Sequence, residues 1–314
     1  MREMNPGEAT EATGPIIHHY VSRFLLRRFA DPKTGLLWVY EKETGRSWRC
    51  NPKNVAAERR YYAFTGEDGK PDNAVEDALS KLEGEVSPII ERVERDLALP
   101  SPNERAVLAL FIALSVSRVP SFRKPVERFY GEVARKLSLV MAHHKEYFYR
   151  VVGEAERARG QKFDTPVEQV RQAVLNGDLA YEGSPFASLE MMLETSPQIA
   201  EIIHQMRWQF LHAPAGVSFI TSDRPVVWVN PKLPPHPVYG NPGLAQKDIL
   251  LLFPIGPRVC FLARWEGEEG HFGIKSNGVI QINQPIIGYA RKYVFSLKHS
   301  QEIETLAEKI KGDG

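Results

Sequence analysis

The sequence is poor in the residue types that would assign it to a secreted, metal-binding or membrane class. It has two cysteines, Cys50 and Cys260, among 314 residues. Two thiols are too few for a disulfide framework or a four-cysteine zinc site, and their scarcity is typical of a reducing compartment. The longest apolar stretch, residues 107–116, is far shorter than a membrane span. The first fifteen residues hold three glutamates and no apolar core, so we expect no secretory signal, a cytoplasmic location and no membrane contact.

Charge is balanced over the whole chain but not along it. The formal net charge is +1, which excludes the strongly basic surface of a protein that coats DNA. Residues 17–62 nevertheless hold ten Arg or Lys against four acids, whereas residues 67–96 are acidic overall. Two interpretations stay open, because the basic segment could contact phosphate or could simply neutralise the acidic segment.

Capping residues and hydrophobic spacing predict a helical block over about residues 73–212. Its clearest start is Ser101-Pro102-Asn103-Glu104, where the serine and the glutamate have the spacing of a capping box. The residues that follow are apolar almost all round, which indicates a buried helix that ends before Pro120. The other helices predicted in this block cover residues 73–97, 126–152, a stretch from 165 onward, and 197–212.

Short β-rich runs separated by glycine and proline occupy about residues 217–298. They predict an antiparallel sheet, because no helical pattern separates them. A hairpin at residues 36–42 and 46–51 is expected to join this sheet. The strands predicted in the C-terminal part cover residues 217–221, 226–230, 249–254, 259–265, 272–276, 279–283 and 293–297.

Together these elements predict an α+β fold with an N-terminal helix and β-hairpin, a central helical block and a C-terminal antiparallel sheet. We expect residues 1–16 to form a disordered leader and residues 17–300 a single domain. Residues 230–243 contain five prolines and are expected to form a long surface loop. Residues 301–314 are expected to form a short terminal helix, to about residue 311, and a tail.

Two motifs can be compared with a known family. The first follows the pattern His-x-Val-Pro-x-x-x-Leu-x-x-Phe through His19, Val21, Leu26 and Phe29. Ser22 takes the place of its proline. The second and sharper one is Thr221-Ser222-Asp223-Arg224-Pro225. Both resemble the signatures of a large, mostly bacterial family, the domain-of-unknown-function family 4238, and weaker similarity extends over about residues 17–298. The resemblance implies a family but no reaction.

The first motif carries a candidate anion site. Apolar residues recur every four positions from Val21, which predicts a helix over residues 17–29. On such a helix His19, Arg23 and Arg27 form one polar ridge opposite the apolar stripe. Three potential cations on one ridge suit a phosphate or another anion. We assign His19 an acid–base role and Arg23 an anion-binding role; the alternative is a solvated polar face.

Arg118 and Arg123 flank Pro120 at the end of the predicted buried helix. A buried arginine needs a partner, because an uncompensated buried charge is costly. That partner is either a ligand anion or a carboxylate such as Glu83 or Asp223. Both arginines are therefore candidate anion-binding residues, with a structural salt bridge as the alternative.

Asp223 follows a predicted strand and is a candidate catalytic or metal-binding carboxylate. The alternative is turn chemistry, in which Asp and Ser side chains bind their own backbone. A metal ion would require more oxygen or nitrogen ligands, and Glu83 is the other weak candidate. The sequence names no cofactor.

The common catalytic signatures are absent. The chain has no His-Glu-x-x-His, no phosphate-binding P-loop, no Gly-x-Gly-x-x-Gly and no Gly-x-Ser-x-Gly. Arg207 and His212 have the Arg-x4-His spacing of HEPN-type ribonucleases, but an ideal helix would separate them by about 140°.

Three functional hypotheses fit these motifs. The first is an intracellular hydrolase that acts on a phosphate-containing substrate, a nuclease among the options, with His19 and Asp223 catalytic. The second is a non-catalytic module that binds an anion such as a nucleotide or nucleic acid, or a protein partner. The third is that both motifs are structural. The sequence does not decide whether the protein is an enzyme.

Overall fold

The structure is a computed structural model that divides into two compact units. The larger unit comprises Met1–Pro120 and Leu193–Gly314, and the smaller unit comprises Ser121–Met192. The predicted leader, much of the proline-rich loop and most of the predicted terminal helix lie outside the described residues, and the predicted single domain stays a prediction. The residues that the structure describes are 17–62, 64–65, 71–233, 242–301 and 303–305.

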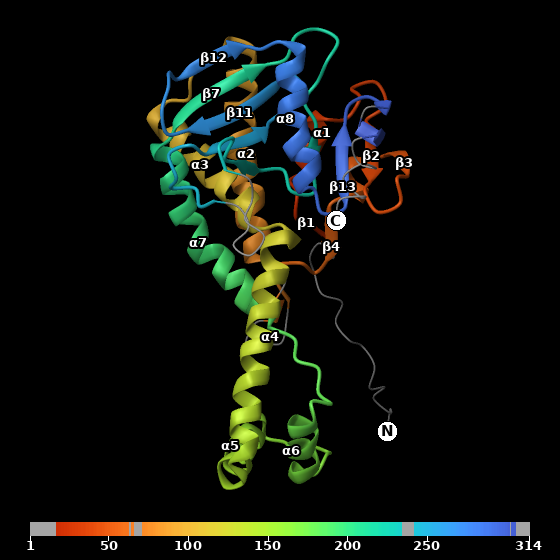
Figure 1. The fold of residues 1–314 in the computed structure, drawn as a ribbon, viewed down its shortest axis with the longest axis vertical. Coiled ribbons are helices and arrows are strands. Elements are labelled where there is room, and N and C mark those ends of the chain that lie inside the picture. The colour runs from red at the N-terminus through yellow and green to blue at the C-terminus, as the bar shows by residue number, and fades with distance from the viewer. Residues whose placement is uncertain (1–16, 63, 66–70, 234–241, 302, 306–314) are drawn as a thin grey trace, which may run out of the picture. The chain divides into compact units, whose positions relative to one another are not determined.

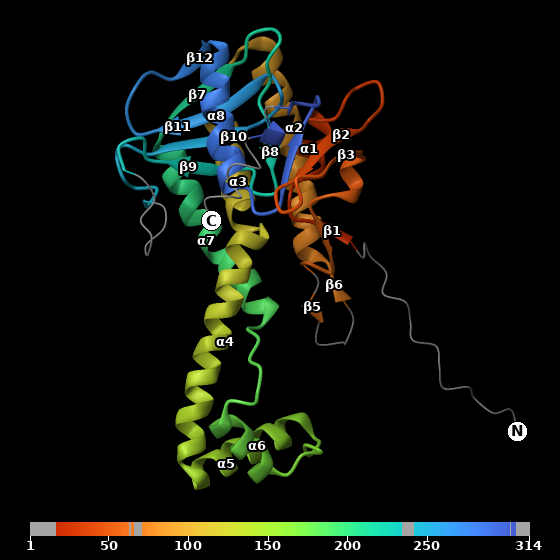
Figure 2. The same ribbon diagram turned by 45° about the vertical axis from the view of Figure 1, so that its right-hand side comes forward.

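The larger unit contains a five-stranded sheet with helices on both faces, and the predicted α+β class is confirmed (Figures 1 and 2). Neighbouring strands are antiparallel except for the parallel pair β12–β7. In order across the sheet the strands are β12 (Gly270–Gly273), β7 (Arg207–His212), β11 (Val259–Arg264), β10 (Leu250–Pro254) and β9 (Val227–Val229). The helices that cover its two faces are α3 (Pro102–Ser117) and α8 (Ser276–Tyr289).

Side chains that alternate along each strand reach these two helices. Leu252 of β10 belongs to the same core cluster as Ile286 of α8. The next residue, Phe253, contacts Phe111 of α3, with ring centroids 6.0 Å apart. Successive side chains of a strand point to opposite faces, so both faces are buried. This double coverage explains why β10 and β11 are apolar runs rather than alternating patterns.

A second sheet of four antiparallel strands contains the predicted hairpin. Its strands, in order, are β3 (Ser47–Cys50), β2 (Leu37–Glu41), β13 (Tyr293–Ser296) and β8 (Thr221–Ser222). The hairpin and its pairing with a C-terminal strand are therefore confirmed. Gly45 closes the hairpin turn with a φ of 71°, a conformation that side-chain-bearing residues rarely adopt. Two short pairs complete the strands: β1 (Ile17–His19) with β4 (Ala57–Arg59), and β5 (Phe64–Thr65) with β6 (Pro71–Asp72).

The helix predicted over residues 17–29 is wrong in its first half. Residues 17–19 form β1, and His19 pairs with Ala57 of β4. The helix α1 covers only Arg23–Arg28. The apolar stripe was placed correctly, since Leu25 and its apolar neighbours on α1 are buried. Strand pairing with β4 overrides the local helical spacing, so His19 does not share a helical ridge with the two arginines.

Two long helices of the larger unit agree with prediction. α2 (Ala74–Asp96) matches the predicted residues 73–97. α3 begins with a capping box: the Ser101 hydroxyl accepts the Glu104 backbone N–H, and the Glu104 carboxylate accepts the Ser101 backbone N–H at 2.8 Å. The second half of α3 is buried on every side, as a helix between a sheet and another helix must be.

The smaller unit is helical. Its helices are α4 (Pro120–His143), α5 (Lys145–Arg159) and α6 (Val167–Asn176), and α7 (Pro185–Gln205) begins in this unit and continues in the larger one. The helix predicted over residues 126–152 is interrupted at His144, between α4 and α5. The buried residues Ala142, Phe148 and Val174 form a small core in this unit. Among the described residues no single helix could cross a membrane, and α3 and α4 meet the length and composition criteria only as a bent pair.

Two other predicted elements are wrong. The helix predicted over residues 197–212 is the end of α7, which contains Pro197, followed by the strand β7. Arg207 and His212 lie five positions apart on that strand and so point to opposite faces, which removes the Arg-x4-His pair as a site. The strand predicted over residues 279–283 is part of α8.

Candidate functional site

Asp223 is a buried anchor between the end of β8 and the start of the neighbouring strand β13. Its carboxylate accepts backbone N–H groups from Arg291 at 2.8 Å, Lys292 at 2.6 Å and Tyr293 at 3.0 Å. Its own backbone N–H donates to the Tyr293 carbonyl at 2.9 Å. Burial raises the pKa of Asp223, and the three N–H donors oppose that rise. With three donors around it, this carboxylate is occupied by the turn that precedes β13, which favours the structural interpretation.

The other polar residues of the second motif also bind within it. The Ser222 hydroxyl donates to the Arg224 carbonyl at 2.8 Å and accepts the Arg224 backbone N–H at 3.2 Å. The Arg224 guanidinium lies over the rings of Trp228 and Tyr289, with centroids 5.6 and 5.4 Å away. The sharpest sequence motif therefore ties β8 to β13 and packs beside α8.

Arg118 is a buried arginine whose partner is a carboxylate of the larger unit. It is 1% exposed, and its Nη1 donates to Glu83 Oε1 at 2.9 Å. Burial disfavours its charge, but Glu83, Tyr62 and Glu76 outweigh burial and raise the pKa of Arg118. Its Nε and Nη2 have no hydrogen-bond partner among the described residues. The structural salt bridge that was the alternative interpretation therefore accounts for Nη1 of this guanidinium and not for its other two nitrogens.

Glu76 lies beside this ion pair on α2. Burial, followed by the negative charge of Glu83, raises the pKa of Glu76 to about 7, and the positive charge of Arg118 opposes the rise. One arginine cannot fully compensate the negative charges of two nearby carboxylates. Glu76 therefore keeps its proton more readily than an isolated glutamate does. This makes Glu76 the residue of the cluster that changes charge near neutral pH.

His19 lies at the edge of this cluster rather than on a helix with Arg23. Its Nε2 is 3.2 Å from the Lys53 carbonyl. Burial and the charge of Arg23 lower the pKa of His19, while Glu83 opposes the shift. The charge of Glu83 acts on both His19 and Arg118, whereas the charge of Asp223 acts on other groups, among them Tyr20 and Lys42. The charge of Glu83 thus influences both His19 and Arg118, while Asp223 is held by the backbone N–H groups of residues 291–293.

Arg123 belongs to the smaller unit, where it is buried among that unit's own residues. Its Nε donates to the Ser188 hydroxyl at 2.9 Å, and its Nη2 donates to the Pro185 carbonyl at 3.0 Å. Glu127 lies 4.0 Å from Nη2. These contacts hold the start of α7 to α4, and they favour the structural alternative for Arg123.

Neither metal candidate has the companions that a metal site requires. Within the described ranges no group of three or more His, Cys, Asp or Glu side chains could hold an ion. The Asp223 oxygens accept backbone N–H groups, and Glu83 accepts from Arg118. The weak metal assignment of these two carboxylates therefore finds no support in their surroundings.

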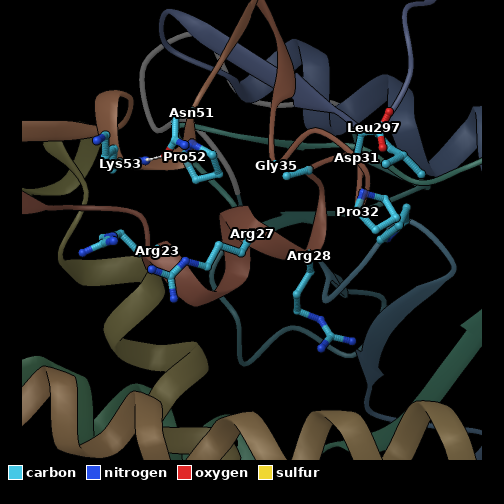
Figure 3. A pocket seen from close by; sticks show the side chains of 12 residues that line it. Arg23, Arg27, Arg28, Asp31, Pro32, Gly35, Asn51, Pro52, Lys53 and Leu297 are labelled. Carbon is cyan, nitrogen blue, oxygen red and sulfur yellow. Dashed lines mark hydrogen bonds between the residues drawn. The ribbon is translucent and has the colours of Figure 1, made fainter.

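A basic cleft of about 680 Å³ lies beside α1 in the larger unit (Figure 3). Arg23 and Arg27 are exposed on one side of α1, and no partner for either guanidinium occurs among the residues described. Arg28 differs, because it pairs with Glu94 and donates to the Ile255 carbonyl. The twelve lining residues are Arg23, Arg27, Arg28, Ala30, Asp31, Pro32, Gly35, Asn51, Pro52, Lys53, Pro257 and Leu297.

The four-stranded sheet positions the rest of the cleft. Leu37 at the start of β2 pairs with Cys50 at the end of β3, and Trp38 pairs with Ser296 at the end of β13. The segments that leave these three strand ends therefore meet at one edge of the sheet. The helix η1 (Pro52–Asn54) follows β3, and the Asn51 side chain caps it by accepting the Lys53 backbone N–H at 3.1 Å. The hairpin thereby places Lys53, the third cation of the cleft, close to α1.

Part of this cleft is predictable from the sequence. Arg23 was assigned to an anion site, and Arg27 was recognised as its neighbour four residues on. Lys53 and Asp31 were missed, because nothing in the local pattern shows that the hairpin ends lie against α1. The one available signal was the basic excess of residues 17–62.

Comparison with known proteins adds a family and no activity. Residues 17–300 match the family model described as protein of unknown function (DUF4238), so the chain belongs to that family. No curated protein and no solved structure matches the chain. The resemblance seen in the two motifs is therefore confirmed over nearly the whole chain.

Replacement of Asp223 tests its anchoring role. In Asp223→Asn the amide group can accept at one oxygen only, and its NH2 faces backbone donors, so at least one buried N–H loses its partner. We expect the free energy of unfolding to fall by about 2–3 kcal/mol, measured by urea denaturation. Asp96→Asn, on the exposed end of α2, is the matched control and should change it by less than about 0.5 kcal/mol. Equal unfolding midpoints for Asp223→Asn and the wild type would contradict the anchor.

Replacement of Glu76 tests the cluster around Arg118. Because the folded-state pKa of Glu76 is about 7, above its ordinary value of 4.5, the folded protein retains a proton that the unfolded chain releases. This contribution stabilises the protein below about pH 4.5 and is lost as the pH rises toward 7. Glu76→Gln should therefore gain melting temperature over the wild type between these pH values, whereas the exposed Glu85→Gln should show a constant difference. A pH-independent difference for Glu76→Gln would refute the proposed charge state.

Proposed function

We propose that this protein binds a phosphate-bearing ligand in the basic cleft of its larger unit, as a binding module rather than through a catalytic centre. The observation that carries the proposal is the set of three cations, Arg23, Arg27 and Lys53, around one open hollow. In the described part of the chain none of their side chains has a carboxylate or hydrogen-bond partner. Such a concentration of unpaired positive charge favours an anion.

The chemistry of these cations suits a phosphate. A guanidinium presents planar N–H donors that match phosphate oxygens in pairs, and a lysine adds a mobile point charge. Arg28, on the same helix, shows the alternative, since it is neutralised by Glu94 and a backbone carbonyl. Arg23 and Arg27 lie one helical turn apart and both line the cleft (Figure 3).

The lining supports binding more strongly than catalysis. It contains no serine, cysteine, histidine or glutamate, and Asp31 is its single carboxylate. Asp223, the carboxylate expected to act as base, is held by three backbone N–H groups near β13. A nucleophile or general base in the lining would be needed for hydrolysis by the protein's own side chains.

A phosphoester hydrolase is the second candidate, and the position of His19 favours it. His19 contacts the backbone of Lys53, which lines the cleft, and burial with the charge of Arg23 lowers its pKa. A neutral imidazole close to a bound phosphate could accept a proton from water. This candidate requires turnover that depends on His19.

Substitution of the cleft arginines tests the binding role. Arg23→Gln and Arg27→Gln should each weaken the binding of methyl phosphate by about tenfold, because each removes a charge-assisted hydrogen bond. Titration calorimetry on the full chain measures this. Arg95→Gln, at an exposed position of α2, is the control and should bind as the wild type does.

Three outcomes separate the candidates. Weaker binding in both cleft variants, without hydrolysis of p-nitrophenyl phosphate by the wild type, supports a binding module. Hydrolysis that disappears in His19→Ala supports the hydrolase. Unchanged affinity in both cleft variants refutes the cleft as the site.

A further inference from the structure

We infer that the ligand of the cleft is a small phosphomonoester whose phosphate contacts Arg23, Arg27 and Lys53 and whose organic part carries hydroxyl groups toward Asp31. A sugar phosphate or another polyol phosphate has this chemistry. The inference rests on the proposed function and adds the class of ligand. It is drawn from the charge of the cleft, the carboxylate at its far end and the absence of aromatic side chains in its lining.

The charge of the cleft fits a dianion. Arg23, Arg27 and Lys53 contribute three positive charges, and the one negative charge of the lining, that of Asp31, lies 3.9 Å from Arg49 Nη2. Arg28 adds little, because Glu94 neutralises it. These three cations can compensate one phosphomonoester, whose charge is about −1.5 to −2 at neutral pH. A bisphosphate would place its second charged group near a carboxylate of the same sign.

The cleft is polarised along its length (Figure 3). Arg23, Arg27 and Lys53 lie toward one end, and Asp31 lies toward the other, beside Pro32 and Leu297. A ligand that fills the cleft must therefore offer an anion at one end and groups acceptable to a carboxylate and to apolar side chains at the other. Hydroxyl groups on a short carbon chain or ring meet both requirements.

Asp31 retains the capacity to accept hydrogen bonds. Its Oδ1 accepts the Lys33 backbone N–H at 2.8 Å, and its Oδ2 lies 3.9 Å from Arg49 Nη2, too far for a hydrogen bond. The Asp31 side chain is 37% exposed. A carboxylate has about four acceptor positions, so several remain for ligand hydroxyl groups.

The lining does not suit a nucleobase. All twelve lining residues lie in the described part of the chain, and none is aromatic. Proteins that bind single strands without reading the sequence stack bases on aromatic side chains. Pro32, Pro52 and Pro257 offer apolar contact but no ring face of that kind. A base attached to the sugar would therefore add little affinity.

Calorimetric titration of the full chain with matched phosphates tests the inference. Methyl phosphate supplies the phosphate alone, ribose 5-phosphate adds hydroxyl groups, and adenosine 5′-monophosphate adds a base. We expect ribose 5-phosphate to bind about tenfold more tightly than methyl phosphate, the effect of one or two hydrogen bonds to a charged acceptor. Adenosine 5′-monophosphate should bind no more tightly than ribose 5-phosphate. A phosphoserine peptide should bind no more tightly than methyl phosphate.

Asp31→Asn locates the selectivity within the cleft. The amide oxygen can still accept the Lys33 N–H, so the turn is retained while the charge is lost. We expect the preference for ribose 5-phosphate to fall to less than about threefold, and ribose 1,5-bisphosphate to bind more tightly than to the wild type. Glu43→Gln, an exposed acid in the hairpin turn, is the control and should retain the wild-type preference.

The outcomes distinguish this inference from the proposed function. Binding of methyl phosphate that depends on Arg23, together with no preference for ribose 5-phosphate, would overturn the ligand class and leave the anion site standing. The same holds if adenosine 5′-monophosphate, a short RNA or the phosphoserine peptide binds about tenfold more tightly than ribose 5-phosphate. Failure of every phosphate to bind would overturn both.

Discussion

The interaction on which the candidate site depends is the hydrogen bonding of one buried carboxylate to three consecutive backbone N–H groups. Asp223 holds the turn at residues 291–293, and this fixes where β13 begins. β13 lies between β8 and β2, so its position determines where the N-terminal hairpin joins the sheet. The hairpin ends in turn carry Asp31 and Lys53 to the cleft beside α1. Asp223 thus sets the geometry of a candidate site whose lining it does not join.

The sharpness of a sequence motif does not show whether its residues are structural or are candidates for ligand binding. The second motif ties strands together through Ser222 and Asp223 and packs Arg224 against aromatic rings. Arg118 and Arg123 are each held by neighbours within their own units. The exposed cations of the cleft, Arg23, Arg27 and Lys53, belong to α1 and η1 instead, and no partner for their side chains occurs among the described residues. Most buried polar groups are satisfied by the fold, whereas an exposed cation is free to meet a ligand.

Much of the fold was predictable from local chemistry. The capping box at Ser101, the hairpin turn at Gly45 and the buried stripe of α1 all depend on neighbouring residues, and each was placed correctly. The errors occurred where tertiary contacts override local spacing. Residues 17–19 pair with β4, and residues 279–283 belong to a helix that covers an apolar sheet face.

The cleft itself could not be predicted, because its residues come from segments that are far apart in the sequence. Arg23, Lys53 and Leu297 meet only because β2, β3 and β13 end at one edge of a sheet. The sequence indicated a basic region and one of its arginines. It could not show which of the basic residues would be neutralised, as Arg28 is by Glu94.

A crystal structure of the full chain soaked with tungstate, an anomalously scattering analogue of phosphate, tests the central claim most directly. The account predicts one strong anomalous peak between Arg23, Arg27 and Lys53, with the carboxylate of Asp223 still bound to residues 291–293. A peak beside Nε and Nη2 of Arg118 or beside Arg224, with none in the cleft, would contradict the account.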